Sequence, residues 1–175
     1  IVLTAINYHI YTFDTAPSYG KSEQTLGKII KKHQLNGSIH IISKLDPTIS
    51  LTETDKVLDS IQRSLETLGI DSFEAFLFHR EDEFRHFNLQ KERTLARILD
   101  QKLAKKIGVS LYTPDLALEL LNLPFLSYFQ IPSNVLDRRF LNNGFIKKAH
   151  SQKSELAIRS LYLQGLLLMN PKKLP

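Results

Sequence analysis

The apolar positions along the chain alternate between two periods. Short runs rich in β-branched and aromatic residues are followed by longer stretches with apolar residues three and four apart, which is typical of repeated βα units. The pattern predicts strands at 10–14, 39–44, 74–79, 105–110, 128–133 and 156–162, and helices near 1–7, 22–32, 51–68, 88–102, 114–121 and 142–150. We therefore expect one α/β domain over residues 1–175.

The helix expected at 51–68 has the clearest signals at its ends. The segment Ser50–Glu53 fits a capping box at its start, and Gly69 is a typical C-terminal stop. Between them, apolar residues recur on one face: Val57, Ile61, Leu65 and Leu68. This face predicts packing against the sheet, with the opposite polar face in solvent.

Four polar residues lie at or just beyond the ends of the first three predicted strands. They are Asp14, Tyr19, Lys44 and His79. If these strands are parallel neighbours, their carboxyl ends meet at one rim, and so do these side chains. Each residue alone has a structural explanation, as a helix cap, a turn former, an exposed lysine or a structural histidine. Together they form a set of complementary acid and base groups, which favours a catalytic rim.

The spacing of the strand-end polar residues predicts the architecture. It is 30 residues from Asp14 to Lys44, 35 from Lys44 to His79, 31 from His79 to Ser110, and 30 from Gln130 to Ser160. A (β/α)8 barrel uses about 31 residues for each unit. We expect such a TIM barrel, incomplete in this chain because about six units are present and the N- and C-terminal parts are missing. A doubly wound sheet is less favoured, because no Gly-rich dinucleotide turn follows a strand.

The predicted rim could deliver a proton to a carbonyl oxygen. A tyrosine hydroxyl is a weak acid at neutral pH, but the ammonium of Lys44 would stabilise the phenolate of Tyr19 and make it a better donor. Asp14 would fix Lys44 in position, and a neutral His79 could donate a hydrogen bond to the same oxygen. Such a site is suited to carbonyl reduction but needs a hydride donor.

Composition limits the alternatives. The chain has no cysteine, which excludes disulfides and thiolate metal sites, and it has no apolar run of about 18 residues. We expect a cytoplasmic protein without a membrane partner. The net charge is +5, but the basic pairs are scattered: Lys31–Lys32, Lys105–Lys106, Arg138–Arg139, Lys147–Lys148 and Lys172–Lys173. We expect no nucleic-acid partner, because such a patch needs clustered charges, and a phosphate-bearing cofactor explains the charge equally well.

The segment Phe13–Glu23, followed by Leu26–Gly27, resembles the signature of the aldo-keto reductase family. Later motifs follow in that family's order: Ile42–Lys44, Phe78–His79, Ile107–Ser110, Gln130–Asn134 with Asp137–Arg139, and Arg159–Leu167. The resemblance covers nearly the whole chain, from about the second to the seventh barrel strand. Because the chain begins at Ile1 and its only methionine is Met169, we expect either a piece of a longer protein or a sequence lacking some residues.

The resemblance implies roles for individual residues. Tyr19 would be the proton donor, Lys44 and Asp14 would tune it, and His79 would orient the substrate. Ser110 and Gln130 would hold the nicotinamide carboxamide. The segment that would wrap the ring and pyrophosphate contains Arg159, Ser160, Gln164 and Gly165. The family favours NADP(H) over NAD(H), although its segment for the 2′-phosphate is not in this chain.

Two positions depart from the family pattern. Leu111 stands where an asparagine often helps to hold the carboxamide, and Tyr112 could fill part of that space. Arg159 stands where an aromatic residue commonly stacks on the nicotinamide. Its guanidinium could stack, contact a phosphate or form a salt bridge.

The resemblance leaves a second function open. Some proteins of this fold resemble regulatory channel subunits, which would bind the cofactor without turnover. A metal-dependent hydrolase using His79 and Asp14 is disfavoured, because such sites need more ligands and Lys44 would repel a cation. The substrate would be a small carbonyl compound, and the charged segment 80–87 is either a loop over the site or simply solvated. The oligomeric state is open.

Overall fold

A computed structural model describes residues 1–170 and 172. Lys173 of the last basic pair, and the end of the predicted domain at 175, lie outside this part. Its strands form one parallel sheet in sequence order: β1 (Thr12–Asp14), β2 (His40–Lys44), β3 (Ala75–Phe78), β4 (Ile107–Ser110), β5 (Leu126–Pro132) and β6 (Glu155–Arg159). All predicted strands are therefore confirmed, with boundaries shifted by a few residues.

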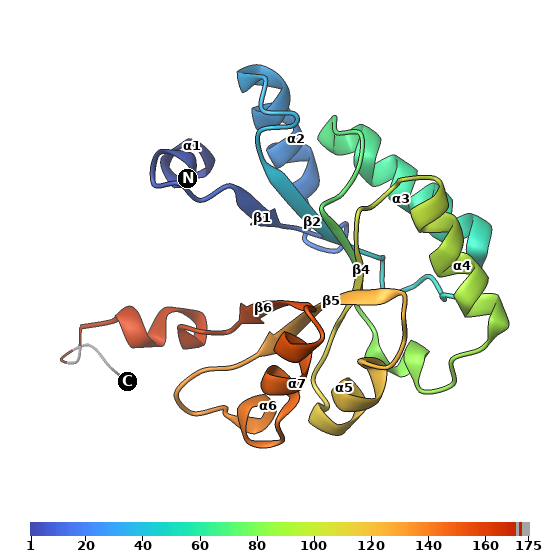
Figure 1. The fold of residues 1–175 in the computed structure, drawn as a ribbon. Coiled ribbons are helices and arrows are strands. Elements are labelled where there is room, and N and C mark those ends of the chain that lie inside the picture. Colours follow the sequence, from blue (N-terminus) through green and yellow to red (C-terminus); the bar gives the residue numbers. More distant parts are fainter. Residues whose placement is uncertain (171, 173–175) are drawn as a thin grey trace.

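Helices connect the strands. They are α1 (Val2–Asn7), α2 (Ser22–His33), α3 (Thr54–Leu68), α4 (Leu89–Asp100), α5 (Pro114–Leu120), α6 (Arg139–Asn142) and α7 (Phe145–Ser151), with 3₁₀ helices η1 (Glu81–Phe84) and η2 (Leu163–Leu168). In Figure 1 the strands follow an arc from β1 to β6, and α2 to α5 lie along its outer side. Within residues 1–170 and 172 no helix is long and apolar enough to span a membrane.

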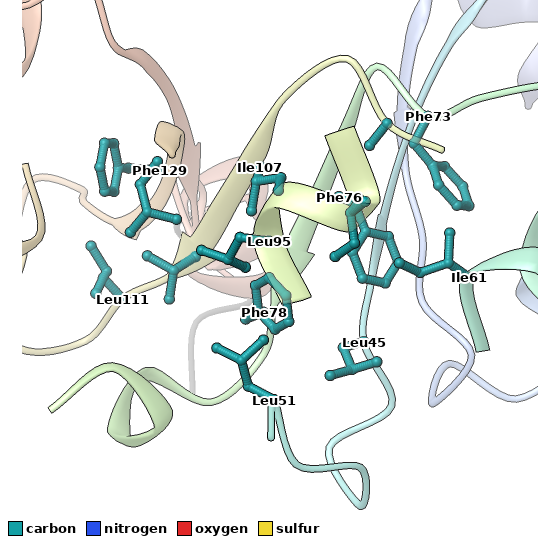
Figure 2. Close-up of a cluster of buried hydrophobic side chains, with 14 of the residues drawn as sticks. Leu45, Leu51, Ile61, Phe73, Phe76, Phe78, Leu95, Ile107, Leu111 and Phe129 are labelled. Atoms are coloured by element: carbon teal, nitrogen blue, oxygen red, sulfur yellow. The ribbon is translucent and has the colours of Figure 1, made fainter. Parts of the chain in front are cut away.

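Alternation along the strands divides the buried side chains between two faces of the curved sheet. Phe76 and Phe78 belong to the large cluster that the sheet shares with the helices (Figure 2), whereas Leu77 belongs to a small cluster on the other face. Burying one such side chain stabilises the fold by about 1.5–3 kcal/mol. Side chains on the same face as Leu77 point to the inside of the curved sheet. The polar residues at the rim lie on this face.

Two glycines allow close packing. A Cβ atom on Gly108 would lie 1.9 Å from the carbonyl oxygen of Tyr128, so β4 and β5 approach closely only with glycine there. On Gly27, a Cβ atom would lie 2.2 Å from the carbonyl oxygen of Thr67, which places α2 directly against α3. Both clashes are with backbone, which cannot easily move away.

The third helix confirms part of its predicted signals. Its apolar face is buried, and Gly69 ends it with φ at +69°. The predicted start at residue 51 is wrong, because α3 begins at Thr54 and Leu51 is instead a buried core residue. Only half of the capping box forms: the Ser50 N–H donates to the Glu53 carboxylate at 3.2 Å, but the Ser50 hydroxyl does not cap the helix.

Two other boundaries differ from the prediction. The helix expected at 142–150 is α7, which begins at Phe145 because Gly144 before it adopts φ of +81°, and a separate short helix, α6, precedes it. The strand expected at 156–162 ends at Arg159, because Ser160 has φ of +60° and turns the chain away from the sheet.

Candidate active site

An ion pair lies where β1 and β2 end. Lys44 is only 1% exposed, and its Nζ lies 2.6 Å from each carboxylate oxygen of Asp14, which is 38% exposed. Both residues close neighbouring parallel strands at positions that face the inside of the curve. A buried ammonium needs a charged partner or hydrogen-bond acceptors, and the Asp14 carboxylate provides both.

Tyr19 and His79 complete the group. The Lys44 Nζ lies 4.9 Å from the centroid of the Tyr19 ring, and the rings of Tyr19 and His79 meet edge to face with centroids 6.3 Å apart. Tyr19 comes from the loop after β1 and remains 45% exposed, so it is open to a small molecule. The structure thus brings together all four residues that the sequence pattern indicated, and their catalytic roles stay a prediction.

His79 is held in its neutral form. Burial lowers the pKa of the His79 imidazole below 6.5, and the positive charges of Lys44 and Arg159 lower it further. Its Nδ1 atom is buried and has no hydrogen-bond partner in the described part of the chain. Buried polar atoms are nearly always paired, so an unpaired one in a rim of reactive groups is suited to a ligand.

The buried carboxylate of Glu23 holds the end of the strand that carries Lys44. Glu23 accepts hydrogen bonds from the hydroxyls of Ser43 at 2.7 Å and Ser64 at 3.0 Å, and so ties α2 to β2 and α3. Ser43 directly precedes Lys44, so these bonds hold the end of β2. Glu23 belongs to the signature segment, but its role could not be predicted from the sequence. Its partners Ser43 and Ser64 lie 20 and 41 residues away, so no local pattern indicates the contacts.

Ser110 and Gln130 extend the rim along β4 and β5. They pair in register and are 2% and 6% exposed. Gln130 Nε2 donates to Asp14 Oδ1 at 3.3 Å, which joins these two residues to the ion pair. A hydroxyl and an amide can together satisfy the donor and the acceptor of a carboxamide. This pair therefore offers both a donor and an acceptor at the rim.

Arg159, at the end of β6, lies over Tyr112. Its guanidinium carbon is 3.9 Å from the centroid of the Tyr112 ring, and its Nη2 donates to the carbonyl oxygen of Leu111 at 3.3 Å. The side chain of Leu111 is buried in the core, so this position offers only its backbone. Arg159 Nε is buried without a partner, and no carboxylate within residues 1–170 and 172 forms an ion pair with Arg159.

The remaining candidates lie on an exposed turn beyond β6. The Ser160 carbonyl accepts from Asn134 Nδ2 at 3.3 Å, and Gln164 and Gly165 adopt φ of 56° and 93° within η2. The turn is held by its own backbone, because the N–H of Gly165 donates to the Tyr162 carbonyl at 2.9 Å and the N–H of Leu163 donates to the Ser160 carbonyl at 3.1 Å. No hydrogen bond in the described residues joins these three candidates to Asp14, Tyr19, Lys44 or His79.

The charged segment 80–87 contacts the loop after β4. The Glu81 carboxylate accepts from the backbone N–H of Tyr112 at 2.6 Å and of Thr113 at 3.0 Å, while Arg80 pairs with Asp82 at 2.8 Å. Phe84 is buried in the core. The segment therefore fixes the loop after β4, and its role toward a substrate stays a prediction.

The described residues contain no group of three His, Cys, Asp or Glu that could hold a metal ion. What they contain at the rim is a tyrosine, a paired lysine and a neutral histidine beside a serine–glutamine pair. This arrangement is typical of the class of site that performs general acid–base chemistry. The comparison with known proteins points to the same class: the chain belongs to the aldo/keto reductase family, whose sequence model matches residues 1–170.

Individual relatives are distant. Protein REDOX 2 from Catharanthus roseus is 30% identical over 140 residues, which is 69% of this chain and 43% of the relative. An aldo-keto reductase from Mycobacterium sp. (strain JLS) is 30% identical over 103 residues, which is 58% of this chain and 36% of the relative. The chain thus spans less than half of the length of these curated relatives.

Solved structures establish the fold. An aldo-keto reductase from Bacillus halodurans superposes with a TM-score of 0.76 at 20% identity, covering 97% of this chain and 57% of that one. Aldose reductase from Giardia lamblia gives 0.72 at 22% identity, covering 91% and 59%. The six parallel strands are thus the matching part of a (β/α)8 barrel, which confirms the predicted fold class, incomplete in this chain.

Proposed function

We propose that this chain carries the catalytic rim of an NAD(P)H-dependent oxidoreductase that reduces an aldehyde or ketone to an alcohol. The observation that carries the proposal is the contact set of Lys44. Its buried ammonium is held by both oxygens of Asp14 and lies 4.9 Å from the Tyr19 ring centroid. A paired ammonium beside an accessible phenol serves proton donation, and membership of the aldo/keto reductase family supports this reaction.

In this proposal, Tyr19 and His79 bind the carbonyl oxygen. Tyr19 transfers its hydroxyl proton to that oxygen as the carbonyl carbon is reduced, and the Lys44 ammonium stabilises the phenolate that remains. Asp14 keeps Lys44 in place without accepting a proton. His79, neutral because burial lowers its pKa, aligns the carbonyl by a hydrogen bond. General acid catalysis of this kind contributes about 10²- to 10⁴-fold to the rate.

The bound cofactor would supply the hydride. Ser110 and Gln130 would hold its carboxamide, and the segment from Arg159 through Ser160 to Gln164 and Gly165 would contact the ring and pyrophosphate. The unpaired Arg159 Nε and the exposed side chains of Ser160 and Gln164 support this assignment. We propose NADP(H) rather than NAD(H), in agreement with the net charge of +5, a small-molecule carbonyl substrate, and a cytoplasmic location.

Binding and turnover of the full-length protein test this function together. Titration with NADPH and with NADH, followed by quenching of tyrosine fluorescence, should give saturable binding with a lower Kd for NADPH. Addition of aldehydes and ketones should then oxidise NADPH, seen as loss of absorbance, with one alcohol formed for each NADPH consumed. Binding without turnover on a broad carbonyl panel would instead favour the cofactor-binding regulatory function, and absence of binding would contradict both.

A further inference from the structure

Arg159 is the one charged rim residue named above whose charge is not balanced. The ammonium of Lys44 is neutralised by Asp14 at 2.6 Å. Arg139, which lies near the same loop, is neutralised by Asp137 at 2.9 Å. Arg159 contacts the face of the Tyr112 ring and the backbone carbonyl of Leu111, and it pairs with no carboxylate among the described residues. A guanidinium stays protonated in proteins, so Arg159 adds a permanent positive charge to the site.

That charge is held in a fixed place. Tyr112, on which the guanidinium stacks, is anchored on both sides of its peptide: its N–H donates to Glu81, and its carbonyl accepts from Arg139 Nη1 at 3.3 Å. Arg159 also contacts the Leu111 carbonyl. The charge is felt at the rim, since after burial and Lys44 it is the next cause that lowers the pKa of His79.

Arg159 also lies beside the residues that would hold the cofactor. Arg159 pairs in register with Pro132, and two residues earlier Ala157 pairs with Gln130. Because side chains two residues apart on a strand share a face, Arg159 and Gln130 both face the inside of the curve. Its Nε is buried and has no acceptor among the described residues, and a ligand held by Ser110 and Gln130 is an acceptor that the proposed function supplies.

We infer that Arg159 makes this site bind the reduced nicotinamide cofactor more tightly than the oxidised one. The inference rests on the proposed function. The oxidised ring carries a positive charge and the reduced ring none, whereas the phosphates and the adenosine are the same in both. A fixed cation near the ring therefore weakens binding of the oxidised form alone. This arrangement favours loading of reductant and release of the oxidised product.

A contact between Arg159 and a phosphate would act differently. It would strengthen binding of both forms by the same factor, because both carry the same phosphates. A contact with the carbonyl substrate would change neither affinity when substrate is absent. The ratio Kd(NADP⁺)/Kd(NADPH) therefore separates the three roles.

The experiment is a fluorescence or calorimetric titration of the full-length protein with NADPH and NADP⁺. It compares the native protein with Arg159→Gln, which removes the charge and keeps a donor for the Leu111 carbonyl, and with Arg159→Lys, which keeps the charge. The matched control is Arg139→Gln, which keeps a side-chain donor for the Tyr112 carbonyl and removes a charge that Asp137 already neutralises. Both ligands report on the same folded fraction, so partial misfolding does not change the ratio.

We expect Arg159→Gln to lower the ratio about tenfold, chiefly by tighter binding of NADP⁺, as removal of one nearby unit charge predicts. Arg159→Lys should stay within about threefold of the native ratio, and Arg139→Gln within about twofold. An unchanged ratio in Arg159→Gln, or equal weakening of both ligands, overturns the inference but leaves the proposed function intact. If the native protein binds neither ligand, the proposed function fails with it.

Discussion

The two ends of the sheet use charge in opposite ways. At the amino end, Glu74 accepts from Lys106 at 2.7 Å and Lys105 at 2.9 Å, and Lys106 also pairs with Glu155 at 2.6 Å. At the carboxyl end Lys44 is paired with Asp14, but among the described residues Arg159 has no carboxylate and His79 Nδ1 has no partner. Satisfied charges stabilise a fold, and unsatisfied groups are available to ligands. The difference assigns stability to one end and chemistry to the other, as is usual in barrels of this type.

The largest effect that tests this comparison should come from Lys44→Met. The variant removes the charge that stabilises the phenolate, so we expect kcat for carbonyl reduction to fall about 10²- to 10⁴-fold. The fold should survive because Asp14 is 38% exposed and water can solvate it. Steady-state kinetics and thermal unfolding measure the two effects.

Lys106→Met, at the amino end, is the matched control. It removes a lysine that is likewise bound to a carboxylate, yet kcat should stay within about twofold of native because Lys106 is remote from the rim. Equal losses of kcat in the two lysine variants would show that the ends do not differ as described.

Glu74→Gln should affect stability and not turnover. Hydrogen bonds from Lys106 and then Lys105 lower the pKa of Glu74 from 4.5 to about 2. The native state therefore binds fewer protons than the unfolded state, so this contribution is complete above pH 4.5 and is lost as pH falls towards 2. We expect a loss of about 1 kcal/mol in the free energy of unfolding at pH 7, measured with urea, and a smaller loss at pH 3.

Glu119→Gln provides the comparison for that variant. Glu119 is exposed on α5 and its carboxylate has no partner among the described residues. Its unfolding free energy should change by less than about 0.5 kcal/mol at either pH. If Glu74→Gln were as mild at pH 7, the amino-end ion pairs would contribute nothing measurable to stability.

The smallest effect should be seen in the titration of His79. Burial is the main cause that lowers the pKa of His79, with Lys44 and then Arg159 adding to it, so Arg159→Gln should raise this pKa while leaving it below 6.5. Ring ¹H–¹⁵N NMR, assigned with His79→Gln, would measure the shift. Because the folded state favours the neutral imidazole, the contribution of His79 to stability falls as pH drops below 6.5.

Arg139→Gln should leave the titration of His79 unchanged, because Arg139 is paired with Asp137. A drop in the pKa of His79 in Arg159→Gln, or no change at all, would mean that the unbalanced charge does not reach the rim.

The sequence predicted the repeating part of the fold better than its irregular parts. Strand order follows from alternating βα units, and the apolar face from Val57 to Leu68 is buried as expected. The short helix α6, at 139–142, was missed because four residues carry no helical period. The start of α3 was misplaced because Leu51 packs into the core, a tertiary effect that outweighs a capping motif.

For the candidate site, the sequence located the strand-end residues but not their supports. Asp14 and Lys44 could be paired because each closes a strand of the same parallel sheet. The backbone N–H groups of Tyr112 and Thr113 donate to Glu81, which lies 31 and 32 residues earlier in another loop. Neither loop has a sequence motif that indicates this contact. Such contacts depend on how the loops fold back, which spacing alone does not determine.

The central claim is that Tyr19 donates the proton at this rim, and Tyr19→Phe tests it most directly. The variant keeps the ring beside Lys44 and His79 but lacks the hydroxyl. Titration with NADPH and kinetics on a carbonyl substrate of the native protein should be measured on the same preparation. The account predicts a Kd for NADPH within about threefold of native and a kcat lower by at least about 10²-fold. An unchanged kcat would contradict it.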